Sequence, residues 1–333
     1  MQEPRALRIA CDAAGYRATL EPQIVPKPAP GEVLIRVAYS SVNYKDALAG
    51  TGRGKILKTF PLIGGIDASG WVVESAHPGY RADDPVIATG WGMGVTRDGG
   101  YANYLCVPGA WLQPLPAGLT LREAMILGTA GLAAALAVRR LLDNGQCPER
   151  GPLLVTGASG GVGCIAIAIL ARLGFEVVAL SGKGDLHDWL RRLGASRVIP
   201  RAGLSGTGRA LEHAVWGGAI DTVGGDTLAR ILPAVVLGGN VASVGLAGGA
   251  DFATTVMPFI LRGIALLGCN TVDLADPLRR QLWQRLADDW QPPRALIHTA
   301  TIALDALPEV FVRVLDGRGR GRILVDFKAE PAP

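Results

Sequence analysis

The sequence of 333 residues lacks the features that would commit it to a metal site or a disulfide framework. Its five cysteines are odd in number, widely scattered and never placed at metal-ligand spacing: Cys11, Cys106, Cys147, Cys164 and Cys269. We therefore expect free thiols in a reducing cytoplasm, with no disulfide and no bound metal.

Long apolar runs, dense basic blocks and a targeting segment are also missing. No stretch approaches the ~20 uninterrupted apolar residues that span a bilayer. Residues 1–16 carry charge on both sides of a very short apolar piece, unlike a signal peptide. Lys and Arg total 33 against 29 Asp and Glu, and no basic block is interleaved with aromatic residues. These absences predict a cytoplasmic protein that binds no membrane and no nucleic acid.

Residues 153–170 are the most informative stretch that is present. Leu153 to Val155 reads as a buried strand, residues 157–163 as a glycine turn, and the apolar run from Val162 to Arg172 as a helix packed on a sheet. A strand, a glycine turn and a helix N-terminus together make an anion site, because unpaired backbone N–H groups and the helix dipole both point at the turn.

The spacing of the small residues in this turn matches a dinucleotide fingerprint. Ala158, Gly160 and Gly163 occupy its three glycine positions, with alanine replacing the first glycine. Gly160 would let a pyrophosphate approach the backbone, and Gly163 would let the helix lie close to the strand. The residues of this turn that we expect to contact the dinucleotide are Ala158, Ser159, Gly160, Gly161, Val162 and Gly163.

The pattern of elements divides the chain into two domains. Residues 1–125 read as short strands separated by Gly and Pro, which is typical of a compact barrel-like β domain. Residues 126–271 alternate strand and helix, which predicts a parallel sheet covered on both faces. We assign residues 272–333, a helix followed by short strands, to the first domain. The predicted fold class is α/β, a Rossmann-type doubly wound sheet plus a β-barrel domain.

The end of the second predicted strand indicates which dinucleotide is bound. The strand over residues 175–180 runs into Ser181, Gly182 and Lys183, without the carboxylate that would hold the ribose hydroxyls of NAD. A hydroxyl and an ammonium there favour a 2′-phosphate, hence NADPH, and Arg201 is a second phosphate candidate. The alternative is that Ser181 and Lys183 form an ordinary solvated turn.

The chain resembles the medium-chain dehydrogenase/reductase superfamily along essentially its whole length. Within it, the match is to the zinc-free acrylyl-CoA reductase family, whose members are often labelled quinone oxidoreductases. The motifs that carry the resemblance span residues 42–47, 60–67, 90–94, 128–131, 155–163, 194–198, 219–224, 245–249 and 255–262.

The resemblance implies a GroES-like catalytic domain and chemistry without zinc. Zinc enzymes of this superfamily place a Cys ligand where this chain has Asn43, and a Gly-His-Glu where it has Gly65, Ile66 and Asp67. A tetrahedral site cannot be assembled from these side chains. The chemistry left is hydride addition to an activated acceptor, such as an alkene conjugated to a thioester, a ketone or a quinone. We expect Asp67 to be structural.

The resemblance also implies roles for single residues. Tyr44 is the candidate that donates to the developing enolate or delivers a proton, with a packed strand-end tyrosine as the alternative. Asn43 either bonds the substrate or holds its turn, and Trp91 either closes over the substrate or fills the space between domains. Cofactor contacts are expected at Tyr44, Thr129, Leu246, Ile260 and Asn270. Arg53 belongs to a basic cluster that either meets CoA phosphates or is a solvated face, as do the arginines at 313, 318, 320 and 322.

Three functions remain open from the sequence. The first is NADPH-dependent reduction of acryloyl-CoA to propanoyl-CoA. The second keeps fold and cofactor but changes the acceptor to a quinone or an alkenal, and the third is a non-catalytic NADPH-binding sensor. The resemblance further implies a homodimer that joins the sixth strands into one continuous sheet, and edge strands do invite pairing.

Overall fold

The structure, a computed structural model, describes residues 3–13, 15–204 and 208–327. These residues form two compact units. The first comprises residues 1–129, 272–287 and 299–333, and the second comprises residues 130–271 and 288–298. The α/β class with a parallel sheet and a separate β domain is confirmed.

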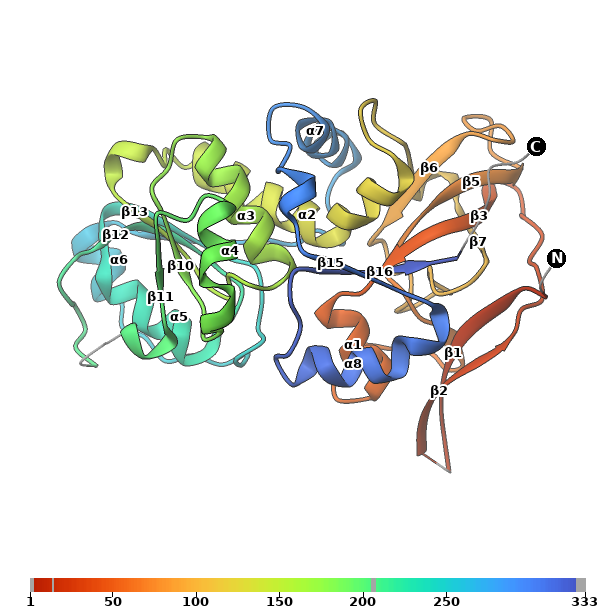
Figure 1. Ribbon diagram of the computed structural model, residues 1–333, viewed down its shortest axis with the longest axis horizontal. Helices are drawn as coiled ribbons and strands as arrows, with labels where there is room; N and C mark the ends of the chain where they lie inside the picture. The colour runs from red at the N-terminus through yellow and green to blue at the C-terminus, as the bar shows by residue number, and fades with distance from the viewer. Residues whose placement is uncertain (1–2, 14, 205–207, 328–333) are drawn as a thin grey trace. The chain divides into compact units, whose positions relative to one another are not determined.

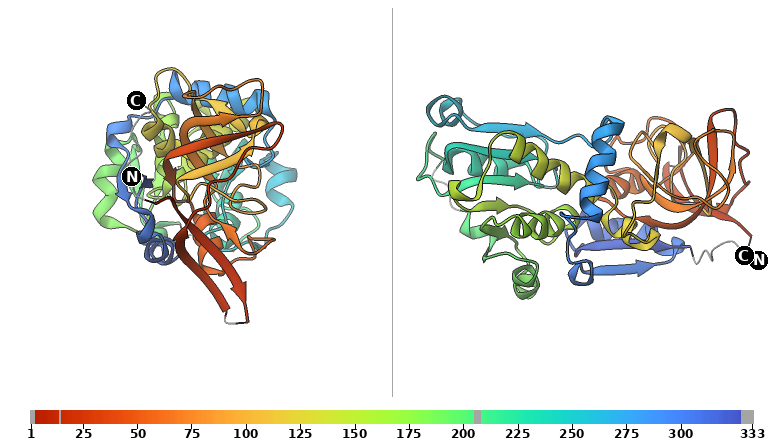
Figure 2. Two further views of the ribbon diagram at one scale, coloured as in Figure 1. Left: turned by 90° about the vertical axis from the view of Figure 1, so that its right-hand side faces the viewer. Right: turned by 90° about the horizontal axis from the view of Figure 1, so that it is seen from above.

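The first unit is built on two sheets. A three-stranded sheet has the order β2-β1-β4, and its β1–β2 hairpin projects from the rest of the unit (Figure 2). A larger sheet has the order β15-β16-β3-β5-β6-β8, with β7 also paired to β3. The strands are β1 (Arg5–Asp12), β2 (Gly15–Pro22), β3 (Glu32–Ser41), β4 (Leu62–Ile63), β5 (Asp67–Ser75), β6 (Pro85–Thr89), β7 (Tyr104–Pro108), β8 (Leu112–Pro114), β15 (Thr299–Ile302) and β16 (Arg322–Asp326). Alternating Val, Ile and Ala side chains of β3, β5 and β6 fill its core.

The described residues of this unit also form the helices α1 (Tyr44–Thr51), α7 (Asp276–Ala287) and α8 (Leu307–Leu315), together with the start of α2 (Leu121–Asp143). Helices α1 and α8 lie side by side (Figure 1), so close that a Cβ on Gly50 would overlap the Phe311 ring. The expectation that only short strands follow the first helix of residues 272–333 is wrong for α8. Its buried Leu307, Val310 and Phe311 follow helical spacing, and Pro308 stands at its first turn, so the signal was present.

The second unit is a single parallel sheet of six strands in the order β11-β10-β9-β12-β13-β14, with helices packed along it (Figure 1). This is the order 3-2-1-4-5-6 of a doubly wound dinucleotide-binding fold. Its strands are β9 (Leu153–Val155), β10 (Val177–Leu180), β11 (Arg197–Ile199), β12 (Trp216–Asp221), β13 (Val235–Ser243) and β14 (Ala265–Gly268). Its helices include α3 (Gly161–Arg172), α4 (His187–Arg192), α5 (Gly225–Ile231) and α6 (Met257–Arg262).

The units differ from the predicted domains in two places. Residues 126–129 belong to the first unit, and residues 288–298 belong to the second. Within the second unit, Trp189 Nε1 donates to the Leu296 carbonyl at 2.7 Å and Arg172 Nε donates to the Asp289 carbonyl at 2.6 Å. These long-range bonds hold 288–298 in that unit and have no local sequence signal.

Helix α2 (Leu121–Asp143) is broken at Gly128, where φ is 51° and ψ is −153°. It is the one helix among the described residues that is long and apolar enough to cross a membrane, but 78% of its most apolar window is buried inside the protein. The run is therefore a core helix.

Candidate functional site

The glycine turn of the second unit has the geometry of a phosphate cradle. Gly157 has a φ of +55°, and Gly160 caps α3 without any side-chain cap. A Cβ at Gly163 would lie 2.5 Å from the Gly157 carbonyl oxygen, which explains why only glycine fits. The first turn of α3 holds no acidic side chain. The turn therefore presents backbone N–H groups that suit a pyrophosphate.

A buried carboxylate that sequence reasoning left without a role shapes the neighbouring loop. Asp221, at the end of β12, accepts bonds from Thr156 Oγ1 at 2.6 Å and from the Gly224 amide at 2.8 Å. Burial raises the pKa of Asp221, against the lowering effect of these hydrogen bonds. The Asp-Thr-Val-Gly segment was among the motifs, but the side-chain partner of its carboxylate, Thr156, lies 65 residues away.

Thr222 links the glycine turn to the loop that carries Leu246. A Cβ on Gly157 would overlap Thr222 Oγ1, and a Cβ on Gly245 would overlap the Thr222 carbonyl oxygen. The structure therefore brings Leu246, whose side chain is 52% exposed, to the same carboxyl edge of the sheet as the glycine turn. Ligands of open parallel sheets bind at this edge.

The end of β10 gathers the residues predicted to select NADPH. Ala158 donates its amide to the Leu180 carbonyl at 3.3 Å, so the glycine turn lies beside this strand end. The buried Ser181 hydroxyl accepts from the Lys183 amide at 3.2 Å, which leaves its own proton to donate. A Cβ on Gly182 would lie 3.4 Å from Arg201 Nε. Arg201 therefore does reach this strand end.

Ile260 and Asn270 lie farther along the sheet. Ile260 is in α6 with 71% of its side chain exposed, and Asn270 follows β14, which is three strands from β9. Asn270 shares the carboxyl edge with the glycine turn. Cofactor contacts at these two residues stay predictions.

The first unit contains a buried hydrogen-bond cluster centred on Asp67, at the start of β5. Its carboxylate accepts from Ser41 Oγ at 2.6 Å, from Asn43 Nδ2 at 2.8 Å and from Thr129 Oγ1 at 2.5 Å. The Thr129 amide donates to both oxygens at 3.0 and 3.1 Å. Asp67 is thus structural, as expected, and it fixes two predicted site residues, Asn43 and Thr129.

Arg322 and Gly128 complete this cluster. Arg322 is 2% exposed and donates to Ser41 Oγ at 2.9 Å and to the Ile126 carbonyl at 2.8 Å. Its suggested place among the CoA-binding arginines is therefore wrong, because its guanidinium is buried. A Cβ on Gly128 would lie 2.6 Å from Asp67 Oδ2, so glycine is needed to let the kink approach the carboxylate.

Asn43 is the N-cap of α1, and Tyr44 is the first residue of that helix. Asn43 and Asp46 form a capping box, and Asp46 also accepts from the Ile66 amide at 2.9 Å. Burial and the nearby Asp67 raise the pKa of Asp46 to about 7. The side chain of Asn43 is therefore engaged within the protein, which favours its turn-holding role.

Tyr44 is half-buried, and no hydrogen bond joins its hydroxyl to another described residue. The capping box and Asp67 together hold the helix start that presents this phenol. A free hydroxyl on a fixed helix start suits a group that donates to a ligand.

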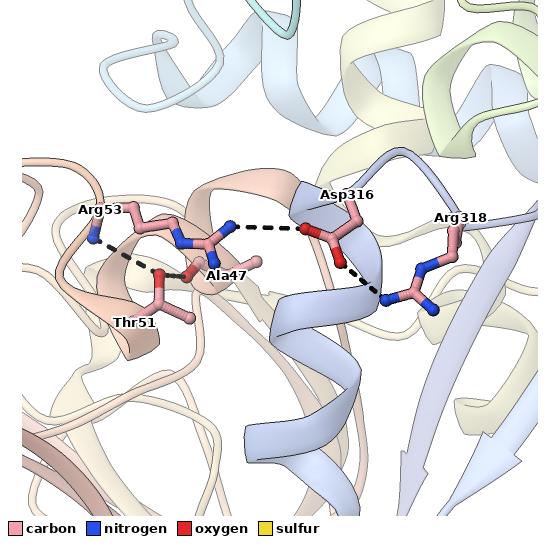
Figure 3. Close-up of polar contacts among 5 residues, drawn as sticks. All are labelled: Ala47, Thr51, Arg53, Asp316 and Arg318. Carbon is pink, nitrogen blue, oxygen red and sulfur yellow. Dashed lines mark hydrogen bonds and ion pairs between the residues drawn. The ribbon is translucent and has the colours of Figure 1, made fainter.

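Trp91 and Arg53 lie elsewhere in the first unit. Trp91 is half-buried in the loop after β6, and the Arg279 guanidinium carbon stands 4.6 Å from its ring centroid. Arg53, just after α1, is exposed and pairs with Asp316 at 3.5 Å, and Arg318 pairs with the same carboxylate at 2.7 Å (Figure 3). The fold thus joins two basic clusters that are far apart in sequence.

The donor set of the first unit does not suit a metal. Within residues 3–13, 15–204 and 208–327, no three His, Cys, Asp or Glu side chains gather where they could hold an ion. At the positions where zinc enzymes carry ligands, Asn43 and Asp67 bond to each other.

Two family comparisons cover most of the chain. Residues 29–117 match the alcohol dehydrogenase GroES-like domain, and residues 161–288 match the zinc-binding dehydrogenase domain. Among curated proteins, the acrylyl-CoA reductase AcuI of Ruegeria pomeroyi is 45% identical over 90% of this chain and 91% of its own length. YhfP of Bacillus subtilis, named provisionally as a quinone oxidoreductase, is 46% identical over 97% of this chain and 98% of its own.

Solved structures of similar sequence match this chain over nearly its whole length. Escherichia coli YhdH with bound NADPH has a TM-score of 0.92 and 44% identity, covering 96% of this chain and 99% of its own. Bacillus subtilis YhfP with NAD bound has a TM-score of 0.93 and 43% identity, covering 98% and 100%.

Proposed function

We propose that this chain, which belongs to the medium-chain dehydrogenase/reductase superfamily and is an NADPH-dependent oxidoreductase, reduces the activated C=C bond of acryloyl-CoA to give propanoyl-CoA. The acceptor is the new element of this proposal. The relative named acrylyl-CoA reductase supports it, and so does the arrangement of donors in the first unit.

The residues of the second unit fit NADPH. The glycine turn and the start of α3 would hold the pyrophosphate, and Ser181, Lys183 and Arg201 would hold the 2′-phosphate. When bound, NADPH supplies a hydride. The hydroxyl proton of Thr129 is already donated to Asp67, so its oxygen lone pairs are left to accept from the carboxamide of the cofactor.

Tyr44 would supply what the acceptor needs from the protein. Hydride addition at the β-carbon of acryloyl-CoA develops negative charge on the thioester oxygen, and a proton must then reach the α-carbon. A phenol with a free hydroxyl donates to that oxygen or delivers that proton at neutral pH. The single observation that carries this assignment is the fixed helix start at Asn43, which presents Tyr44 without engaging its hydroxyl.

Arg53 and Arg318 would meet the phosphates of CoA. Both are exposed cations in the first unit, and both converge on Asp316 (Figure 3). Arginine pairs with phosphate in a bidentate manner, so the two side chains offer more than isolated surface charges do.

Product analysis in heavy water tests the proposal. With NADPH and acryloyl-CoA, mass spectrometry should find propanoyl-CoA that carries a single deuterium, at the α-carbon, because the β-hydrogen comes from the cofactor. Tyr44→Phe should lower kcat by about 100-fold or more. Tyr39→Phe, which alters another half-buried tyrosine of the same unit, should leave kcat unchanged. Absence of propanoyl-CoA would refute the acceptor, and a normal kcat in Tyr44→Phe would remove Tyr44 from the chemistry.

A quinone is the second candidate acceptor, favoured by the name of YhfP. The same cofactor site serves both acceptors. The two acceptors differ in that only acryloyl-CoA carries phosphates, whose binding Arg53 and Arg318 would strengthen.

We also propose that the enzyme is a cytoplasmic homodimer. Strand β14 is an edge of the six-stranded sheet, and the nearby Val256, Ile260 and Leu261 are 64%, 71% and 54% exposed. Pairing with a second copy would satisfy the edge and cover these side chains. Light scattering should give the mass of two chains, and a monomer would contradict the proposal.

A further inference from the structure

Trp91 has a backbone conformation that bulky residues rarely adopt. Its φ is +60°, between Gly90 at 77° and Gly92 at 102°. Such a conformation costs of order 1–3 kcal/mol for a residue with a side chain, and it persists only where the surroundings enforce it. Glycine at this position would be free of the cost, so the indole must contribute something else.

Arg279 holds the indole in place. Its guanidinium lies over the ring at 4.6 Å, and the side chain is completely buried. Its Nη1 donates to the Thr89 carbonyl at 2.8 Å and to Thr89 Oγ1 at 3.1 Å, and its Nη2 donates to the Val272 carbonyl at 3.1 Å. Burial lowers the pKa of Arg279 to about 10, so it stays charged at neutral pH. A buried charged stack of this kind is strong and rigid.

The indole N–H of Trp91 adds a second cost. Its Nε1 is buried and has no hydrogen-bond partner in the part of the chain that the structure describes. A buried donor without a partner costs ~1–3 kcal/mol, and such groups are rare. Two unfavourable features at one side chain point to selection for function rather than for stability.

The stack lies beside the Asp67 cluster. Thr89 is paired with Asp67 in the ladder between β6 and β5, and Gly90 donates its amide to the Ile66 carbonyl at 3.1 Å. Ile66 in turn donates its amide to Asp46 of the capping box before Tyr44. Trp91 therefore follows the strand position opposite Asp67 and flanks the residues that fix Tyr44 and Thr129.

We propose that Trp91 is a specificity-determining residue that limits the length of the acyl group, and that Arg279 is the positioning residue that keeps its indole rigid. The proposal rests on the proposed function, since it names what the acceptor site of that reaction admits. A flat ring fixed by a buried cation cannot move aside for an extra methyl group. The Trp91 ring therefore forms a rigid wall of the acyl site, which favours the three-carbon acryloyl group over longer 2-enoyl groups.

The test compares acryloyl-CoA with crotonyl-CoA, which is one methyl group longer. One methyl group in a rigid apolar site is worth about 10- to 200-fold in kcat/KM. The wild type should prefer acryloyl-CoA by about tenfold or more, and Trp91→Gly should lower that preference by at least tenfold. Trp91→Phe, which keeps a flat ring, should retain it. Glycine accepts the positive φ without strain, so this truncation suits the loop.

Arg279→Lys tests the positioning role, because lysine keeps the charge but loses the planar stack. It should lower the same preference by lowering KM for crotonyl-CoA, while kcat for acryloyl-CoA stays unchanged. Arg280→Lys, which alters the exposed neighbour paired with Asp276, should change neither. Trp71→Ala, which removes another indole stacked on an arginine in this unit, should also leave the preference intact.

Binding of the saturated products gives a readout without turnover. Calorimetry should show that wild type binds propanoyl-CoA more tightly than butanoyl-CoA and that Trp91→Gly does not discriminate. Unchanged preferences in both Trp91→Gly and Arg279→Lys would overturn this proposal alone. Failure of the wild type to reduce either enoyl-CoA would instead overturn the proposed function.

Discussion

Thr129 donates both its amide and its hydroxyl to the carboxylate of Asp67, with the hydroxyl at 2.5 Å from Oδ1. The two residues are 62 positions apart, and the kink at Gly128 allows them to meet. The carboxylate also holds Asn43, so one buried side chain fixes both the start of α1 and the residue that follows the kink in α2. Asp67 therefore fixes two of the residues that we propose to form the site, Asn43 and Thr129.

Asp67→Asn should destabilise the protein strongly. The new amide would place a donor against the donors of Ser41, Asn43 and Thr129, and Ser41 also accepts from the buried Arg322. Breaking a buried charge network of this kind costs ~3–5 kcal/mol. Urea unfolding measures this loss. Asp12→Asn, which breaks an exposed pair with Arg17, should cost less than about 1 kcal/mol. Equal losses in the two variants would contradict the role given to Asp67.

Asp46 should make stability fall as pH rises from about 4 to about 7. Its folded pKa is raised to about 7, against about 3.9 when unfolded, so the folded state binds the proton more tightly. The contribution is therefore present at acidic pH and is lost as pH rises through this window. Subtracting the pH profile of Asp46→Asn from that of the wild type should isolate this slope.

For Asp316, the change of stability with pH should have the opposite sign, and the difference between the pH profiles of the wild type and Asp316→Asn should show it. Its pairing with Arg318 and Arg53 lowers the pKa of Asp316, so its contribution to stability is present above the unfolded pKa and is lost on further acidification.

For Asp46, the contradicting outcome is a flat difference profile. If the stability difference between the wild type and Asp46→Asn does not change between pH 4 and pH 7, the pKa of the Asp46 carboxyl is not raised.

Gly163→Ala should weaken both the fold and NADPH binding. The added Cβ would lie 2.5 Å from the Gly157 carbonyl oxygen and 2.8 Å from Ala158 Cα, so the helix must move away from the turn. We expect a loss of ~1–3 kcal/mol in stability and a Kd for NADPH raised about tenfold. Gly184→Ala, where a Cβ would meet nothing within 4 Å, is the matched control. If Gly163→Ala binds NADPH with the wild-type Kd, the glycine turn does not bind the cofactor.

Arg201→Gln should erode the preference for NADPH over NADH. A hydrogen bond to a charged group is worth about 1.5–3 kcal/mol, so the ratio of kcat/KM values should fall by about ten- to a hundredfold. Arg197→Gln, on β11 and also exposed, should leave the ratio intact. Equal kcat/KM values for the two cofactors in the wild type would defeat the assignment of a 2′-phosphate site.

Arg53→Gln should raise KM for acryloyl-CoA and leave KM for benzoquinone unchanged, because only the first acceptor carries phosphates. Rising salt should have the same selective effect on the wild type, since exposed charge pairs are screened. Arg17→Gln, in the β1–β2 hairpin, is the control. A salt effect of equal size on both acceptors would leave the basic cluster as an ordinary solvated face.

The sequence predicted the second unit better than the first, and the reason is physical. The glycine turn is local: its strand, its small residues and its helix follow one another within 20 residues, so spacing alone reveals it. The Asp67 cluster is not local. Arg322 reaches Ser41 across 281 positions, and nothing near either residue announces the partner.

Other features carried signals that were weaker. The capping pair of Asn43 and Asp46 with Gly52 in the left-handed region marks α1, which composition alone did not suggest. Helix α8 has a buried face at helical spacing within a tail that otherwise predicts strands. The stack of Arg279 on Trp91 could not be foreseen, because Arg279 comes from a helix 188 positions later in the chain.

The most direct test of the central claim is a panel of acceptors assayed with NADPH by loss of its absorbance. Acryloyl-CoA, benzoquinone and acrolein should be compared by kcat/KM at one salt concentration. Acryloyl-CoA should have the highest value. A higher value for benzoquinone or acrolein would contradict the assignment of acryloyl-CoA as the acceptor.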